Sequence, residues 1–407
     1  MRVIEVRSPR ELKSLLQDLK VDPYGIEIMS PKGISHLVKI NDISCIAANI
    51  LKQEMLSLGG DAALPREVLT GRLKKTDCLL MGNLSQFNRL REKLKPQPFN
   101  LNVLGKELSV VLANYRRGAF FIDARGYKLD LSRRTCVMGI LNLTPDSFSG
   151  DGLYRSAGGT GRGREAIRAY AEDMIAGGAR ILDVGGESSR PGAKPVPVKE
   201  EIARTIPVIQ YLAQKIKVPI SIDTSKPEVA KQALDNGACM VNDISGLRDD
   251  AMLKVVSRSH AAVVIMHMKG RPRTMQRDPV YKSLIDDIVD YLKNAVARAE
   301  EAGIAGDKII IDPGIGFGKT PGHNLEILRR LREFKILGKP ILAGPSRKYF
   351  IGKLLNAQPQ RRVSGTIASC VLAAVNGANI VRVHDVKEVA EALTVSDAIL
   401  HSDVPAC

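Results

Sequence analysis

Residues 219–246 read PISIDTSKPEVAKQALDNGACMVNDISG, and this stretch decides the fold class. It begins with a short aliphatic run, PISIDTS (219–225), and ends with a second one, MVNDISG (240–246). Between them, PEVAKQALDNGA (227–238) has a helical pattern and a glycine near its end, where helices commonly terminate. A strand, a helix and a second strand in this order predict a parallel pair of strands.

The same rhythm repeats from about residue 136 onward, where eight short aliphatic or β-branched runs alternate with polar turns and helical stretches. The runs are CVMGILNLT (136–144), ILDVGGES (181–188), PISIDTS (219–225), MVNDISG (240–246), AAVVIMHM (261–268), IIIDPGIG (309–316), PILAGPSR (340–347) and NIVRVHD (379–385). This alternation predicts an α/β fold with a parallel sheet buried on both faces. Eight units favour closure into a (β/α)8 barrel of the TIM type over an open doubly wound sheet.

Polar side chains gather at the ends of these runs. They are Asn142, Glu187, Asp223, Asn242, His267, Asp312, Lys348 and His384. The carboxyl ends of barrel strands meet on one face, and active sites form there. One Asp or Asn after a strand can instead cap the next helix, but caps do not explain eight polar ends in succession. We therefore expect an active site at this face, with His267 as a satisfied barrel histidine rather than a metal ligand.

The basic composition does not by itself identify a partner. A formal charge of +16 and a pI of about 9.6 suit nucleic acid, an acidic membrane surface or an anionic small substrate. In residues 5–20 and 328–339, however, basic residues alternate with apolar ones at helical spacing, as on solvated helix faces. The chain has no Trp and only 4% aromatic residues, so base stacking and nucleic-acid binding are not expected.

The sequence also bears on the cellular compartment. No charged-then-apolar leader opens it, and the longest apolar run (367–383) is interrupted by polar residues, so neither secretion nor a membrane span is expected. The six cysteines are scattered without a C-x-x-C pair, which suits free thiols and indicates neither zinc nor disulfides. We expect a cytoplasmic protein.

Residues 1–118 follow a different plan and predict a small, separate α/β domain with an accessory or interface role. Its expected strands are 2–6, 25–29, 35–40 and 78–82. Its expected helices are 11–19, 43–57 and 84–94. Residues 119–133 are expected to form a linker or hairpin, and residues 134–400 the barrel.

Seven strand-end strings together carry a family resemblance. They are NLTPDSFS (142–149), DVGGESSRPG (183–192), SIDTSK (221–226), VNDISG (241–246), DPGIGFGK (312–319), GPSRK (344–348) and RVH (382–384). In barrel order, they resemble the dihydropteroate synthase family of pterin-binding barrels. Members of that family join 4-aminobenzoate to (7,8-dihydropterin-6-yl)methyl diphosphate in folate biosynthesis, with Mg2+ as cofactor. The resemblance covers about residues 134–398.

The resemblance implies a pterin pocket. Asp223, Asn242 and Asp312 match the residues that bind the pterin edge, with Asp183 behind them and Lys348 over the ring. The chemistry of these side chains agrees, because a carboxylate accepts two donors from an amide and amidine edge at once.

The resemblance also implies a diphosphate site. Asn142 matches the residue that helps to hold Mg2+, and Arg382 and His384 match the diphosphate anchor. Lys348, Arg382 and His384 are the implied catalytic residues. Cationic groups and a metal ion are what a multiply charged leaving group requires.

The amine site involves two loops. Ser346 lies where 4-aminobenzoate is expected, and Ser189 and Arg190 match the second loop of the family. The first loop departs from the family pattern, because Gly150 precedes an acidic residue, Asp151, that the family places one position earlier.

Two alternatives stay open at this point. A pterin-dependent methyltransferase of the same barrel superfamily has no diphosphate to anchor, so Lys348, Arg382 and His384 favour the synthase. A non-catalytic pterin-binding protein would use residues 1–118 as a contact surface. The sequence also leaves open whether the chain forms a homodimer.

Overall fold

The computed structural model describes residues 1–6, 9–144, 161–188, 194–270, 274–276 and 278–401. The chain divides into two compact units, residues 1–113 and 114–407. We describe each unit by itself.

The first unit contains a three-stranded antiparallel sheet in the order β1-β3-β2. Its strands are β1 (Ser35–Ser44), β2 (Asp61–Ala63) and β3 (Lys75–Asn83). Its helices are α1 (Pro9–Asp18), α2 (Pro23–Met29), α3 (Cys45–Ser57), α4 (Leu84–Leu94) and α5 (Leu101–Arg116), with 3-10 turns at Ser30–Lys32 and Arg66–Thr70. One hydrophobic cluster joins the sheet to α3, α4 and α5, as expected for an α/β unit.

Two strands predicted in this unit are wrong. Residues 2–6 form no strand, and residues 25–29 belong to the helix α2. The helix begins at Pro23, and the Asp22 side chain accepts hydrogen bonds from the Tyr24 and Gly25 backbone amides at 2.7 and 3.2 Å. This N-cap, with proline in the first turn, outweighs the β-branched character of the segment.

The second unit is an eight-stranded parallel barrel, as the alternating pattern predicted. The strands are β6 (Cys136–Asn142), β7 (Ile181–Gly185), β8 (Ile220–Asp223), β9 (Met240–Asp243), β10 (Ala262–Met266), β11 (Ile309–Asp312), β12 (Leu342–Ala343) and β13 (Ile380–Val383). Hydrogen bonding runs in the order β11-β10-β9-β8-β7-β6-β13-β12. The barrel closes through a single parallel bridge between Ile311 and Ile341.

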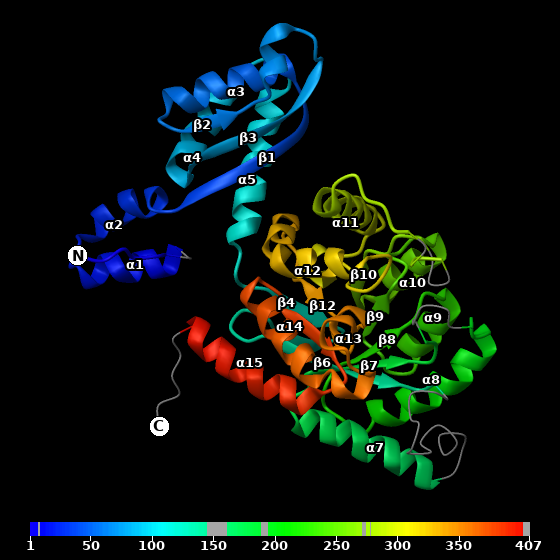
Figure 1. The fold of residues 1–407 in the computed structure, drawn as a ribbon. Helices are drawn as coiled ribbons and strands as arrows, with labels where there is room; N and C mark the ends of the chain where they lie inside the picture. The colour runs from blue at the N-terminus through cyan, green and yellow to red at the C-terminus, as the bar shows by residue number, and fades with distance from the viewer. Residues whose placement is uncertain (7–8, 145–160, 189–193, 271–273, 277, 402–407) are drawn as a thin grey trace. The chain divides into compact units, whose positions relative to one another are not determined.

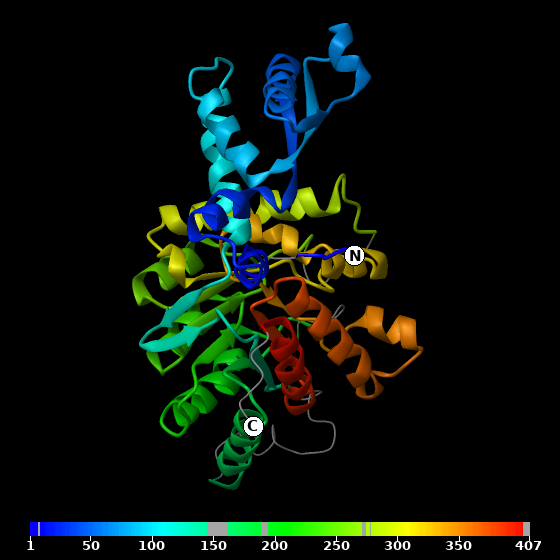
Figure 2. The ribbon, with the colours of Figure 1, turned by 90° about the vertical axis from the view of Figure 1, so that its left-hand side faces the viewer.

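Helices surround these strands in Figures 1 and 2. They are α7 (Gly161–Ala176), α8 (Val198–Ala213), α9 (Pro227–Asp235), α10 (Asp250–Ser259), α11 (Leu284–Glu301), α12 (Pro321–Arg329), α13 (Tyr349–Leu355), α14 (Val363–Val375) and α15 (Val386–His401). Short 3-10 turns occur at Gly306–Lys308, Leu331–Leu337 and Pro359–Arg361. None of the helices in the described residues is long and apolar enough to cross a membrane.

A two-stranded hairpin, β4 (Phe121–Ala124) and β5 (Tyr127–Asp130), precedes the first barrel strand. Its apolar side chains share a core with the residues that begin the barrel strands, such as Cys136 and Ile181. The Arg125 side chain donates to the Ala238 carbonyl oxygen at 3.0 Å, just before β9. The hairpin therefore covers the amino-terminal end of the barrel, opposite the strand ends that carry the polar residues.

Strand periodicity aims the polar residues into the barrel. Side chains two residues apart lie on the same face of a strand. Ile181, which belongs to the interior core with the hairpin, precedes Asp183 by two positions. Met240 and Asn242 are related in the same way on β9. The apolar rows of the barrel interior thus end in polar side chains at the carboxyl face.

Candidate active site

Neighbouring strands bring the predicted carboxylates and amide together. Asp183, which is fully buried, lies on β7, and the registers of β7, β8 and β9 align Gly185 with Asp223 and Asp223 with Asn242. The Asn242 side-chain amide donates to Asp183 Oδ2 at 3.0 Å. The amide thereby helps to satisfy a carboxylate that water cannot reach.

Arg382 links this acidic group to β13, which is separated from β7 by β6 alone. Its guanidinium donates to Asp183 Oδ2 at 2.5 Å and to Asp223 Oδ2 at 2.7 Å. Arg382 lies on β13, so the two bonds cross the mouth from the β13 side to β7 and β8. In this state the predicted diphosphate anchor is thus paired with two of the predicted pterin-binding carboxylates.

Burial shifts the titration of the carboxylates. Desolvation raises the pKa of Asp223 to about 7, against the opposing effect of Arg382. Desolvation also raises the pKa of Asp312 to about 6, although its carboxylate accepts the Gly314 backbone N–H at 2.7 Å. Both groups therefore change charge near neutral pH, and strongly shifted carboxylates of this kind cluster at functional sites.

Lys348 lies over the loop that follows β11. Its Nζ is 4.1 Å from the centre of the Phe317 ring. Gly316 has a positive φ of 84°, and a Cβ there would come within 2.9 Å of the Lys348 side chain. Glycine is needed at position 316 for two reasons, because the backbone is left-handed there and because the Lys348 side chain approaches it closely.

Ser346 and His384 contact each other directly, as neighbours on the loops after β12 and β13. The Ser346 hydroxyl lies 3.0 Å from His384 Nδ1 and accepts the His384 backbone N–H at 3.1 Å. The Ser346 hydroxyl thus contacts both the backbone and the ring of His384 and fixes the position of the imidazole.

Asn142 ends β6 beside Gly185. A Cβ built on Gly185 would lie 3.4 Å from Asn142 Oδ1 and 3.8 Å from Asp223 Oδ2, so both oxygens approach this glycine. No group of three His, Cys, Asp or Glu side chains in the described residues forms a metal cage. A site with one amide oxygen suits Mg2+ bound mainly through substrate phosphates and water.

Sequence reasoning overlooked a buried lysine. Lys319 is 2% exposed, and its ammonium lies 2.9 Å from His267 Nδ1 and donates to the Phe317 carbonyl oxygen at 3.0 Å. Burial lowers the pKa of Lys319 to about 7 and that of His267 to about 2. His267 is therefore a satisfied, neutral barrel histidine, as expected. The signal in the sequence was the lysine that ends DPGIGFGK, a string otherwise composed of loop-forming residues.

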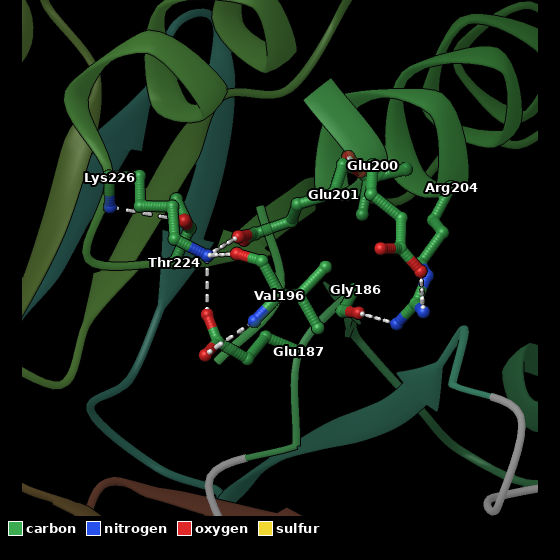
Figure 3. A network of polar contacts seen from close by, with 9 residues as sticks. Gly186, Glu187, Val196, Glu200, Glu201, Arg204, Thr224 and Lys226 are labelled. Atoms are coloured by element: carbon green, nitrogen blue, oxygen red, sulfur yellow. Dashed lines mark hydrogen bonds and ion pairs between the residues drawn. The ribbon is translucent and has the colours of Figure 1, made fainter. Parts of the chain in front are cut away.

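Sequence reasoning also overlooked a group of polar contacts around Lys226, shown in Figure 3, which connects Glu187 after β7 with Val196 before α8. The Lys226 ammonium binds Glu187 Oε2 at 2.5 Å, donates to the Val196 carbonyl oxygen at 2.8 Å and pairs with Glu201. Glu201 lies on α8, and its carboxylate is buried. A Cβ on Gly186 would come within 2.7 Å of the Thr205 side chain, so this glycine lets α8 pack against the strand end. Polar strand ends such as Glu187 thus also serve to anchor loops.

Four predicted positions lie outside the described residues. They are Ser189 and Arg190 on the second loop, and Gly150 and Asp151 on the first. The other predicted site residues, Asn142 to His384, all lie at the carboxyl ends of the barrel strands or in the loops that follow them.

A parallel barrel with buried carboxylates and cations at the carboxyl ends of its strands is typical of barrel enzymes, whose active sites lie at this face. Residues 138–384 match a family model described as pterin binding enzyme.

Comparison with known proteins identifies the family within this class. The chain is 48% identical over 277 residues to dihydropteroate synthase of Escherichia coli (strain K12), which covers 68% of this chain and 95% of the relative. The solved dihydropteroate synthase of Xanthomonas albilineans with 4-aminobenzoic acid matches 70% of this chain and 100% of its own, at 42% identity and a TM-score of 0.64. The chain belongs to the dihydropteroate synthase family.

A longer match includes the first unit. A probable bifunctional folylpolyglutamate synthase/dihydropteroate synthase of Halobacterium salinarum is 39% identical over 395 residues. The match spans 97% of this chain and 46% of the archaeal protein. Residues before the barrel therefore have a counterpart in that relative, whereas the Escherichia coli enzyme matches only 68% of the chain.

Proposed function

We propose that this protein is a dihydropteroate synthase, which joins 4-aminobenzoate to (7,8-dihydropterin-6-yl)methyl diphosphate and releases diphosphate. One observation carries the proposal: the Arg382 guanidinium lies within 2.7 Å of both Asp183 and Asp223. A substrate that carries a donor-rich heterocycle one methylene away from a diphosphate needs carboxylates and a cation this close together.

Pterin recognition is assigned to the acidic side of the mouth. Asp223, Asn242 and Asp312 would accept and donate hydrogen bonds along the pterin edge, while Asp183 orients Asn242 and Arg382 from behind. Buried carboxylates discriminate strongly, because a ligand without matching donors leaves them desolvated and unpaired. Lys348 would cover the ring from the side of Phe317.

Leaving-group stabilisation is assigned to the basic side. The C–O bond at the pterin methylene breaks as the C–N bond forms, and the amine nitrogen then loses a proton to solvent. Arg382, Lys348 and the His384 ring would stabilise the negative charge that develops on the departing diphosphate, and each such donor is worth about 3 kcal/mol. A Mg2+ ion held by Asn142 would supply further charge neutralisation at the diphosphate.

The amine requires positioning rather than deprotonation. An aromatic amine is already a neutral nucleophile, so no strong base is needed, and effective molarity supplies much of the rate. Ser346 would contact 4-aminobenzoate, and the family resemblance assigns Ser189 and Arg190 of the second loop to the same substrate.

Turnover of defined substrates tests the function. Purified full-length protein with the pterin diphosphate, 4-aminobenzoate and Mg2+ should release diphosphate and form dihydropteroate. Replacing 4-aminobenzoate with related amines establishes the acceptor. Binding of the pterin without turnover would reject the synthase and favour a pterin-binding protein, whereas methyl transfer from methyl-tetrahydrofolate would favour the methyltransferase.

The first unit is proposed to be an accessory contact domain. Support comes from the Halobacterium salinarum relative, which matches this region and is named as a probable bifunctional protein. The domain limits we propose are 1–118 for this domain, 119–133 for the connecting hairpin and 134–400 for the catalytic barrel.

A cytoplasmic location and a homodimer complete the proposal. The location is supported by the described cysteines, all of which are buried free thiols, as suits a reducing compartment. Sedimentation of the purified protein tests the homodimer.

A further inference from the structure

Arg347 stands between two predicted site residues but takes no part in the site itself. It has a positive φ of 54°, a conformation that non-glycine residues rarely adopt. Its backbone N–H donates to the Thr366 hydroxyl at 3.0 Å. The left-handed turn lies between Ser346 and Lys348, so its geometry sets the directions of both neighbours.

Asp385 holds the side chain of Arg347. The guanidinium Nε donates to Asp385 Oδ2 at 3.0 Å, and a second guanidinium nitrogen binds Oδ1. The Asp385 side chain is 7% exposed and that of Arg347 is 32% exposed, so solvent screens the pair only partly. This is the bidentate geometry that gives arginine–carboxylate pairs their directional strength.

The pair connects two loops that each carry site residues. Asp385 directly follows His384 in the loop after β13, and Arg347 directly follows Ser346 in the loop after β12. The hydrogen bonds between Ser346 and His384 run beside the ion pair. The two loops are therefore cross-linked at two consecutive positions.

A further arginine supports the turn from the other side. Arg362, at the start of α14, donates to the Arg347 carbonyl oxygen and to the Ala357 carbonyl oxygen, both at 2.9 Å. A Cβ on Gly352 would clash with its guanidinium, so α13 leaves room for this contact. The turn at Arg347 is thus held through its amide, its side chain and its carbonyl group.

We infer that Arg347 and Asp385 are positioning residues, which fix the spacing between Ser346 and Lys348 on one loop and Arg382 and His384 on the other. The inference rests on the proposed function, in which one loop contacts the amine and the other the leaving group. Bond formation and bond cleavage occur at the same methylene carbon, so both groups of contacts must be correct at once. A displacement of about 1 Å can cost about a hundredfold in rate.

Three variants distinguish the effect of losing the Arg347–Asp385 ion pair from the effect of backbone strain at position 347. Arg347→Gly removes the pair but tolerates the left-handed φ, Arg347→Ala removes the pair and is strained, and Asp385→Asn removes only the charge. Glu333→Gln is the matched control, because Glu333 makes a similar bidentate pair with Arg330 outside the barrel mouth.

We expect Arg347→Gly and Asp385→Asn to lower kcat/KM for 4-aminobenzoate by about tenfold to a hundredfold. Affinity for the pterin alcohol, measured by calorimetry, should fall by much less, about threefold at most, because Asp223, Asn242 and Asp312 lie on other strands and only Lys348 shares the loop of Arg347. The double variant should be no worse than either single variant, since both remove one interaction. Arg347→Ala should melt at a lower temperature than Arg347→Gly, while Glu333→Gln should match the wild type in kcat/KM.

Either of two results in the kinetic assay would overturn the inference. One is a kcat/KM within about twofold of the wild type in both single variants, and the other is a double variant whose losses add. An equal loss of pterin affinity and kcat/KM together with a lower Tm would reduce the pair to a structural role. If the wild type binds substrates without turnover, the proposed function fails. The affinity for inorganic diphosphate then decides the positioning role, and an unchanged affinity in the variants rejects it.

Discussion

The mouth of the barrel has two sides with opposite chemistry. The acidic side, formed by β7, β8, β9 and β11, places its polar groups on the strands themselves, where Asp183, Asn242 and Asp312 are buried and the registers of neighbouring strands align them. The basic side, after β12 and β13, places Ser346, Lys348 and His384 in loops that must be held by side chains. The proposed function assigns the rigid pterin edge to the strands and the departing diphosphate to the loops.

Arg382 joins the two sides. It belongs to β13, but both of its carboxylate partners belong to the acidic side. In the proposed function, heterocycle recognition and leaving-group stabilisation would therefore depend on the same network of charges, and a change on either side is expected to affect the other.

The largest effect on binding should come from removing a carboxylate of the acidic side. Asp312→Ala removes a buried acceptor and should weaken binding of the pterin alcohol by about a hundredfold or more, as measured by calorimetry. Asp307→Ala is the control, because Asp307 is an exposed residue that precedes the other end of β11. Pterin affinity that survives Asp312→Ala would remove this carboxylate from the proposed pocket.

Breaking the link between the sides should have the next largest effect. Arg382→Ala should weaken binding of inorganic diphosphate by about tenfold or more, because a charge-assisted donor is lost. It should also raise the pKa of Asp223 above its present value of about 7, since Arg382 now opposes the rise caused by burial.

Pterin affinity as a function of pH measures this second effect. In the proposed function the ionised Asp223 carboxylate accepts the pterin donors, so affinity should fall as the pH drops through the pKa of Asp223. In Arg382→Ala the midpoint should move to higher pH, while Arg382→Lys should move it less. An unshifted midpoint would show that the two sides act independently.

A smaller effect is expected on the pH dependence of the free energy of unfolding. The pKa of Asp312 is raised from 3.8 to about 6, so the folded state holds a proton that the unfolded state releases. Stability is therefore lost as the pH rises between these two values. Asp312→Asn should recover on the order of 1–3 kcal/mol above that window, because one pKa unit corresponds to about 1.4 kcal/mol. Thermal unfolding at low and high pH tests this, and an equal Tm difference at both would contradict it.

The smallest effect should come from Asn142→Ala. One neutral oxygen ligand is lost while the phosphates and water retain the ion, so the Mg2+ concentration for half-maximal turnover should rise by only about threefold to tenfold. A loss of turnover that added Mg2+ does not restore would assign Asn142 another role.

The sequence predicted the barrel well because its strands are buried on both faces and separated by helices. Their limits agree with the structure within a few residues at each end. Prediction failed at Gly25–Met29, where an Asp22 cap made a helix of an apparent strand. The strand-end strings also predicted that Asp183 and Asn242 lie at the barrel mouth, because period two turns both side chains inward.

Tertiary contacts were not predictable in the same way. The bonds from Arg382 to Asp183 and Asp223 join residues 199 and 159 positions apart. The Lys226 group and the Arg347–Asp385 pair likewise depend on which loops meet in space. A single sequence provides residue types at strand ends, but it does not state which of them pair.

The barrel closure has a dynamic consequence. Between β11 and β12 there is one bridge, Ile311 to Ile341, supported by the hydrogen bond from Ile311 N–H to the Pro340 carbonyl oxygen at 3.0 Å. Pro340 has no N–H to extend the ladder. This seam should show the fastest amide exchange of the barrel, and it lies between the loop of Asp312 and that of Ser346. Local opening there would widen the mouth between the pterin side and the amine side while the other seven strand pairings remain intact.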